Sequence, residues 1–168
     1  ILSDSQGIIL GERVCPTSPS KCDVAKLPNK YKVCCKLKDA LENADVFIGV
    51  SAPDILKAQD IKKMNRQAIV FALSNPVPEI MPPEALKGGA YIVATGRSDY
   101  PNQINNILAF PGVFRGVLDF GVNLITDDHQ LKAAQALASL VKKPNRGKIL
   151  PGALDKRAVK AVASVFKS

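Results

Sequence analysis

The sequence predicts an α/β fold with a doubly wound parallel sheet. Three apolar runs, Asp45–Val50, Ala68–Leu73 and Tyr91–Ala94, are rich in β-branched and aromatic residues. Small and polar residues follow each run, and a segment with helical spacing comes next. Continuous apolar strands that alternate with helices are typical of a parallel sheet buried on both faces. We therefore expect these three strands to be neighbours in the sheet, in sequence order.

Length and composition limit the class of protein. The chain has 168 residues, of which 46% are hydrophobic, and this is enough for one domain with a buried core. No apolar run approaches the roughly 20 residues that span a bilayer, and the N-terminus lacks a signal-peptide pattern. We expect a cytoplasmic protein, or one of an organelle matrix, with no membrane partner.

The net charge of +8 comes from lysines spread along the chain. No nucleic-acid-binding motif accompanies them, so no nucleic-acid partner is expected. A solvated basic surface is the favoured interpretation, and a contribution to binding the phosphates of a dinucleotide is the alternative.

The four cysteines are Cys15, Cys22, Cys34 and Cys35. Their spacing matches no paired zinc pattern, and the adjacent Cys34 and Cys35 have poor geometry for a disulfide. An intracellular compartment favours reduced thiols. We therefore expect four reduced structural thiols, with a zinc site as the lesser alternative.

The N-terminal segment begins with a short strand, Ile1–Asp4, followed by a turn at Ser5–Gly7. In dinucleotide-binding folds an acid at the end of the second strand binds the adenosine ribose, which makes Asp4 a candidate; a plain turn residue is the alternative. The glycine-rich turn GxGxxG, which normally lies about 20 residues before this acid, is absent from the chain. We expect Gly11–Asn29 to be mainly loop with a weak helix near Asp23–Leu27.

Three loops follow the three strands and should meet at the carboxyl edge of the sheet, where α/β sheets bind ligands. In Gly49–Pro53 small residues either let a flat ligand approach the backbone or allow tight packing at Gly49. In Ser74–Pro78 the proline after Asn75 biases that residue toward an extended backbone. The third loop, Thr95–Asn106, carries four amides, which both donate and accept hydrogen bonds: Asn102, Gln103, Asn105 and Asn106. Such a cleft suits a nicotinamide cofactor beside a small acid.

Helical spacing predicts the remaining elements. Thr126 and the acids after it suit a helix N-terminus, and we expect Leu131, Ala134, Leu137 and Val141 to form the inner face of that helix. His129 should face solvent or cap the helix. The predicted helices are Lys36–Asn43, Asp54–Asn65, Pro82–Lys87, Gln103–Gly121 with a break at Pro111-Gly112, Thr126–Val141, and Asp155–Phe166 with Val159, Val162, Ala163 and Phe166 inward.

Three blocks resemble malic enzymes of the short, prokaryote-like type. They are ADVFIGVSAPDIL (Ala44–Leu56), IVFALSNPVPEI (Ile69–Ile80) and ATGRSDYPNQINNILAFPGVFRG (Ala94–Gly116), in the family's order. The resemblance implies a Rossmann-like domain truncated at its N-terminus, without the first strand and the GxGxxG turn. It places a partial NAD(P)-binding domain at 1–125 and helices that pack on the same domain at 126–168.

The resemblance also implies a function, which is oxidative decarboxylation of malate to pyruvate and CO2 with reduction of NAD or NADP and with Mg or Mn. Asn75 and Asn106 match the family's asparagines that contact substrate or nicotinamide, and Asn105 is the adjacent candidate, so these three are the substrate-binding candidates. The cofactor-binding candidates are Asp4, Gly49, Val50, Ser51, Ala52, Asn75 and Asn105. The family's catalytic Tyr and Lys and its metal carboxylates precede the part matched here, so we predict no catalytic or metal-ligating residue in this chain, an inactive isolated chain, and a homo-oligomer at full length.

Two other hypotheses remain open. The chain could be a stand-alone nucleotide-binding or regulatory module without catalysis. It could also belong to another dehydrogenase, although the PNQINN and SNPVPE blocks argue against that. The sequence does not choose between NAD and NADP.

Overall fold

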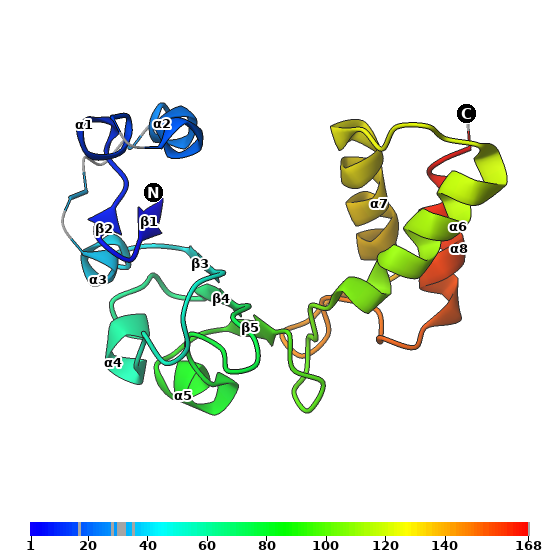
Figure 1. Cartoon of the computed structure of the whole chain (residues 1–168). Coiled ribbons are helices and arrows are strands. Elements are labelled where there is room, and N and C mark those ends of the chain that lie inside the picture. The colour runs from blue at the N-terminus through cyan, green and yellow to red at the C-terminus, as the bar shows by residue number, and fades with distance from the viewer. Residues whose placement is uncertain (17, 28, 30–32, 35, 168) are drawn as a thin grey trace.

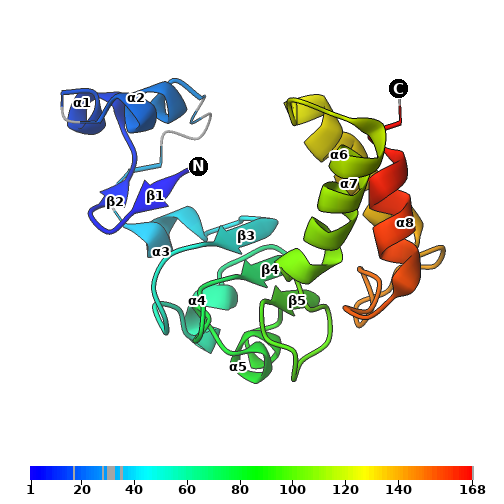
Figure 2. The same cartoon turned by 45° about the vertical axis from the view of Figure 1, so that its right-hand side comes forward.

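The computed structural model of the chain describes residues 1–16, 18–27, 29, 33–34 and 36–167. Figure 1 and Figure 2 show two lobes from two directions. The first lobe holds two small sheets with short helices, and the second consists of three longer helices near the C-terminus. No helix in the described part of the chain is long and apolar enough to span a membrane.

The main sheet has three parallel strands in the order β3 (Val46–Gly49), β4 (Ile69–Ala72) and β5 (Ile92–Thr95). This confirms the predicted neighbours, their direction and their order. Phe47, Val70 and Val93 are paired across the sheet and point into one apolar core.

The expectation of burial on both faces is wrong at β3. Ile48 is 62% exposed and Val46 is also exposed. The core of this lobe lies on the opposite face, where α4 (Ala58–Ile61) and α5 (Pro82–Lys87) cover the sheet. In the described part of the chain, the face that carries Ile48 therefore has less cover than a parallel strand usually has.

Helix α5 has the predicted bounds, whereas α4 is much shorter than predicted. Leu56 donates its backbone N–H to the carbonyl of Glu79, and Asp54 donates to the carbonyl of Pro78. These bonds hold the chain before the helix in a non-helical path. The Asp60 side chain then accepts the N–H of Lys57 at 2.9 Å and caps the single turn.

The N-terminal segment forms a hairpin of β1 (Ser3–Asp4) and β2 (Gly7–Ile8), which is separate from the main sheet. Two helices follow, α1 (Gly11–Val14) and α2 (Pro19–Ala25), where the sequence predicted mainly loop with a weak helix near Asp23–Leu27, which overlaps only the end of α2. Proline is favoured in the first turn of a helix, so Pro19 marks the start that the spacing of apolar residues did not reveal. Helix α3 (Leu37–Ala40) lies inside its predicted range.

The prediction of reduced thiols is wrong for Cys15 and Cys22, which form a disulfide. Helices α1 and α2 pack together and bring the two Cα atoms to 4.4 Å, a separation that a disulfide can bridge. A sequence separation of 7 gave no hint of this pairing. Cys34 is exposed, and the prediction for Cys35 falls outside the described residues.

The second lobe contains η1 (Asn106–Leu108), α6 (Phe110–Phe120), α7 (Asp127–Ser139) and α8 (Lys156–Ser164). The predicted helix at Gln103–Gly121 therefore starts later, and its break comes before Pro111, which occupies the first turn of α6. Leu108, Leu137, Val162 and Phe166 form a core shared by the helices. Helix α6 packs on α8, which also contacts α7, and all three helices contribute to this core.

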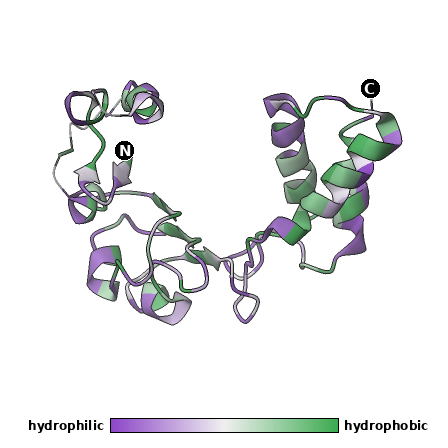
Figure 3. Ribbon diagram, viewed as in Figure 1, coloured by the Kyte–Doolittle hydropathy of each residue, from purple (hydrophilic) through white to green (hydrophobic). Residues whose placement is uncertain are grey.

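Two glycines let α6 approach α8 closely. A Cβ atom at Gly112 would lie 2.6 Å from the Cβ of Val162, and one at Gly116 would lie 2.5 Å from Cδ2 of Phe166. The outward face of α6 stays apolar, with Phe110, Phe114 and Leu118 exposed, and Figure 3 shows most of this helix in the hydrophobic colour.

Helix α7 begins as predicted, with Thr126 as its N-cap. The Thr126 hydroxyl accepts the N–H of His129, and Nδ1 of His129 accepts the N–H of Thr126 at 3.2 Å. The capping role of His129 is confirmed, and its ring also stacks on Phe166 at 4.8 Å. The predicted inner face is wrong at Leu131, which is 65% exposed, and at Ala134, which is also exposed. Leu137 is buried as predicted, and Ala133 turns to the core beside it. The inward positions Val162, Ala163 and Phe166 of the last helical segment are confirmed.

Candidate functional site

The candidate site is the carboxyl edge of the main sheet. Gly49 pairs with Ala72, and Ala72 pairs with Thr95, so the three strands end at the same level. The loops that leave them therefore start side by side, as predicted. This edge is the usual ligand side of an open α/β sheet.

The first loop, Gly49–Pro53, presents a small and accessible surface. Val50 is 79% exposed, and Ser51 and Ala52 are exposed as well. Gly49 is buried instead, and a Cβ atom there would lie 2.5 Å from Cδ of Glu79. Of the two alternatives for Gly49, the structure shows tight packing, with the packing partner supplied by Glu79.

The second loop, Ser74–Pro78, exposes the amide of Asn75. The side chain of Asn75 makes no hydrogen bond with any residue that the structure describes, and the peptide bond to Pro76 is cis. The loop itself is tied to its neighbour, because the Ser74 hydroxyl donates to the carbonyl of Ser51 at 3.4 Å. The loop that carries Asn75 is thus anchored to the first loop, and the side-chain amide of Asn75 is available to a ligand.

The four amide side chains of the third loop differ in solvent exposure. Asn105 accepts the N–H of Ile107 at 3.0 Å and caps η1. Asn106 begins η1 and is exposed, and its side chain has no hydrogen-bond partner among the described residues. Gln103 stays beside the strand end and donates to the carbonyl of Gly96 at 3.4 Å. Only Asn105 and Asn106 of the predicted residues in this loop are exposed.

Asn102 turns inward. It donates to the carbonyls of Val93 and Arg146 at 3.0 and 2.9 Å, and its Oδ1 accepts the N–H of Ile149 at 2.9 Å. Its φ of 57° lies in the left-handed region, which asparagine tolerates better than most residues. This residue joins the end of the sheet to the loop before α8, and the sequence did not single it out for that role.

Asp4 lies in the separate hairpin, and no hydrogen bond or ion pair joins it to the three loops. Lys21 Nζ lies 2.6 Å from its carboxylate, and Arg13 Nη2 lies 2.9 Å from it. Hydrogen bonds from Lys21 and Arg13 hold the pKa of the Asp4 carboxyl well below its usual range. The sequence predicted the turn after Asp4 but not its two cationic partners, Arg13 from α1 and Lys21 from α2.

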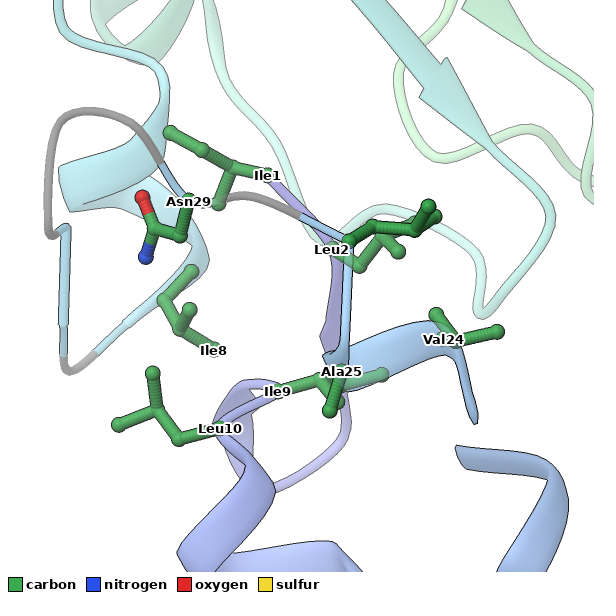
Figure 4. Close-up of a pocket in the computed structure, with 9 residues that line it drawn as sticks. Ile1, Leu2, Ile8, Ile9, Leu10, Val24, Ala25 and Asn29 are labelled. Carbon is green, nitrogen blue, oxygen red and sulfur yellow. The ribbon is translucent and has the colours of Figure 1, made fainter. Parts of the chain in front are cut away.

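Two hollows lie near these elements in the described part of the chain. None of the substrate- or cofactor-binding candidates lines either one, although Asn102 and Gln103 of the third loop line the second. One of about 350 Å³ lies between the hairpin and α2 (Figure 4), and aliphatic side chains line almost all of it. The other, of about 300 Å³, lies between the third loop and residues 147–153. The predicted site residues lie on the open loop surface instead.

The described residues include no cluster of three or more His, Cys, Asp or Glu side chains that could hold a metal ion. These residues therefore do not fit a divalent metal centre. The exposed amides are different, because a side-chain amide can pair with both the donor and the acceptor of a nicotinamide carboxamide or with a carboxylate. The donor set of the three loops fits the nicotinamide half of a dinucleotide.

The parallel sheet and its covering helices make the chain an α/β domain, whose carboxyl edge is the usual place for a ligand such as a nucleotide. Comparison with known families gives a more specific answer, because residues 1–167 match the model of the malic enzyme NAD-binding domain. The chain belongs to the malic enzyme family, and the resemblance deduced from the sequence is confirmed.

Similar proteins with either cofactor are known. The chain is 43% identical over 165 residues to the bifunctional malic/malolactic enzyme of Bacillus subtilis, covering 97% of this chain and 40% of that protein. It is 42% identical over 142 residues to the NADP-dependent malic enzyme of Escherichia coli, covering 83% and 18%. A crystal structure of the NAD-dependent malic enzyme of Thermotoga maritima superposes with a TM-score of 0.88 at 42% identity, covering 96% and 43%. The chain thus spans less than half the length of these relatives.

Proposed function

We propose that this chain forms the nicotinamide side of a malic enzyme active site, which converts malate to pyruvate and CO2 and reduces NAD or NADP. The observation that carries the proposal is the pair of exposed amides at the ligand edge, Asn75 and Asn106, in a domain of this family. Bound NAD or NADP would supply the hydride acceptor.

Each predicted residue has a distinct part in this proposal. Asn75 and Asn106 would orient the substrate carboxylate or the nicotinamide carboxamide without adding a proton to the reaction. Asn105 would act mainly by capping η1 and so fixing the start of the turn that carries Asn106. Val50, Ser51 and Ala52 would form the surface under the cofactor, and Gly49 would let Glu79 support that surface.

Asp4 remains the proposed partner of the adenosine ribose. The Asp4 carboxylate already accepts hydrogen bonds from the N–H of Gln6, from both terminal nitrogens of Arg13 and from Nζ of Lys21. These donors use the roughly four acceptor positions of an ionised carboxylate, so a ribose hydroxyl would replace one of them. The two cations also lie where a nucleotide phosphate would be attracted.

The rest of the proposal concerns the whole enzyme. Malate and pyruvate are its proposed substrate and product, and Mg or Mn is its proposed metal, held by groups other than those described here. We further propose a cytoplasmic or organelle-matrix location and a homo-oligomeric state.

A hybrid enzyme tests this function. In the hybrid enzyme this chain replaces the matching part of the Bacillus subtilis relative, with which it aligns over 165 residues. We expect malate-dependent reduction of NAD or NADP, followed by absorbance at the nicotinamide band, with the unaltered relative as control. A hybrid enzyme that melts cooperatively and binds NADH but does not turn over malate would contradict the proposal and support a binding module without catalysis.

A further inference from the structure

We propose that Glu79 is a positioning residue, which holds the first two loops of the candidate site in the shape that accepts the cofactor. The inference rests on the proposed function for its consequence, although the positioning itself concerns only this chain. Glu79 is 0% exposed and follows the second loop, in the sequence Pro78-Glu79-Ile80.

The carboxylate of Glu79 bridges two loops that are remote in sequence. Its Oε1 accepts the N–H of Ser51 at 2.7 Å and the Ser51 hydroxyl at 3.3 Å. Its Oε2 accepts the N–H of Ser74 at 3.0 Å. One oxygen thus serves the loop after β3, and the other serves the loop after β4.

These bonds begin where the sheet ends. The last bond between β3 and β4 runs from the N–H of Leu73 to the carbonyl of Gly49 at 3.0 Å. Beyond it the strands part, and the N–H groups of Ser51 and Ser74 no longer have a strand partner. Glu79 supplies an acceptor to each of these N–H groups, so it holds the two loops side by side beyond the end of the sheet.

The backbone around Glu79 closes the other end of the first loop. The carbonyl of Glu79 accepts the N–H of Leu56 at 3.0 Å, and the carbonyl of Pro78 accepts the N–H of Asp54 at 3.1 Å. The segment Val50–Pro53 is therefore held on both sides by Pro78 and Glu79. A loop fixed at both ends presents its exposed residues in one arrangement.

The burial of this carboxylate favours a geometric role. A buried carboxylate is costly unless hydrogen bonds or a cation compensate it. Among the described residues no Lys, Arg or His side chain forms an ion pair with Glu79, so backbone N–H groups and one hydroxyl carry the compensation. Charge-assisted bonds of this kind are short and directional, which suits the placement of loops better than an apolar side chain would.

Gly49 completes the arrangement. A Cβ atom at this position would lie 2.5 Å from Cδ and 2.7 Å from Oε1 of Glu79. The absence of a side chain at Gly49 therefore makes the space in which the carboxylate lies. Two residues that flank the site are matched to each other in size.

The test begins with amide hydrogen exchange in the chain itself. In Glu79→Gln only one of the two terminal atoms remains an acceptor, so exchange at Ser51 or Ser74 should accelerate about tenfold or more. Exchange at amides of α8 should not change. The matched control is Glu84→Gln, because Glu84 accepts the N–H of Ala58 at 3.1 Å in the same lobe but away from these loops; there Ser51 and Ser74 should exchange as in the wild type.

Steady-state kinetics of the hybrid enzyme distinguish a failure of this proposal from a failure of the proposed function. In the hybrid enzyme, Glu79→Gln should raise KM for the nucleotide about tenfold with a smaller change in kcat. A hybrid enzyme that is inactive even with Glu79 contradicts the proposed function, while the exchange experiment still decides the role of Glu79. If Glu79→Gln does not fold, Glu79→Asp, which cannot reach both loops, takes its place.

The proposal is overturned if exchange at both Ser51 and Ser74 is unchanged. It is also overturned if all amides of the first lobe accelerate together, because that would show a general loss of stability instead of a local loss of position.

Discussion

Asn102 and Asn106 lie four positions apart and have opposite environments. Asn102 is 8% exposed and makes its three hydrogen bonds within the protein, whereas Asn106 is exposed and leaves its amide to the solvent. The sequence places both in one polar run and does not separate them. What separates them is the left-handed backbone at Asn102, which points its side chain toward Val93 and Ile149.

Replacing each asparagine tests this division. In the hybrid enzyme, Asn106→Ala should lower kcat/KM for malate about 10- to 150-fold, because a hydrogen bond to a charged ligand contributes about 1.5–3 kcal/mol. Its melting temperature should stay near that of the parent. Asn102→Ala should instead lower the melting temperature, since each polar group left unpaired costs about 1–3 kcal/mol.

Paired thermal melts and steady-state kinetics measure both effects. Near-normal kcat/KM for Asn106→Ala together with a sharp fall in melting temperature would show that Asn106 is structural and would remove it from the site.

The stability of the fold should also depend on the ionisation of a single residue, Asp155. Hydrogen bonds from the Arg157 side chain and then from its backbone N–H lower the pKa of Asp155 to about 2. A carboxyl with a lowered pKa in the folded state contributes stability above its ordinary pKa of 3.8, and the contribution is lost as the pH falls through about 2.

We therefore expect Asp155→Asn, which keeps an N-cap but removes the charge, to lose less stability than the wild type between pH 4 and pH 2. Melting temperatures over this range compare the two proteins. Parallel curves would mean that the Asp155–Arg157 contact contributes nothing to acid stability.

At the scale of elements, regular patterns were predictable and local anchors were not. The three strands and α5 follow directly from apolar runs and proline positions. Helix α4 was overestimated because the bonds from Asp54 and Leu56 to the segment Pro78–Glu79 come from a distant part of the chain. The Cys15–Cys22 disulfide was missed for a similar reason, since it depends on how α1 and α2 pack.

The close contact between α6 and α8 should make the fold sensitive to a side chain at Gly116. Gly116→Ala would place a methyl group 2.5 Å from Cδ2 of Phe166 and 2.7 Å from the carbonyl oxygen of Ala163. Overpacking of this kind costs about 1–3 kcal/mol, so the melting temperature should fall.

Gly152→Ala is the matched control, because a Cβ atom there meets nothing within 4 Å. Equal melting temperatures for Gly116→Ala and Gly152→Ala would contradict the close packing of α6 on α8.

For the whole molecule, the sequence predicted the fold class and the family, and the comparisons confirm both. The position of the three loops at one edge of the sheet was predictable, whereas their role in binding stays a prediction. The buried residues that hold these loops, Glu79 and Asn102, were not predictable. In the sequence they are ordinary polar residues, and only long-range contacts show that they are buried. The two lobes likewise arise from packing of α6 that the local pattern does not encode.

The isolated chain of 168 residues should show no malate-dependent reduction of NAD or NADP, with Mg or Mn supplied. General acid–base groups each contribute about 10²–10⁴-fold in rate, and the predicted residues of this chain bind and orient instead. A coupled absorbance assay at high protein concentration makes the measurement. Robust turnover would show that the catalytic groups lie within this chain after all.

We propose that the three loops at the carboxyl edge of the sheet contact the nicotinamide cofactor. Hydrogen exchange of the hybrid enzyme, measured by mass spectrometry with and without NADH, tests it most directly. NADH binding should slow exchange at Gly49–Pro53, Ser74–Pro78 and Thr95–Asn106, with little change in α7 and α8. Binding of NADH with unchanged exchange in all three loops would contradict it.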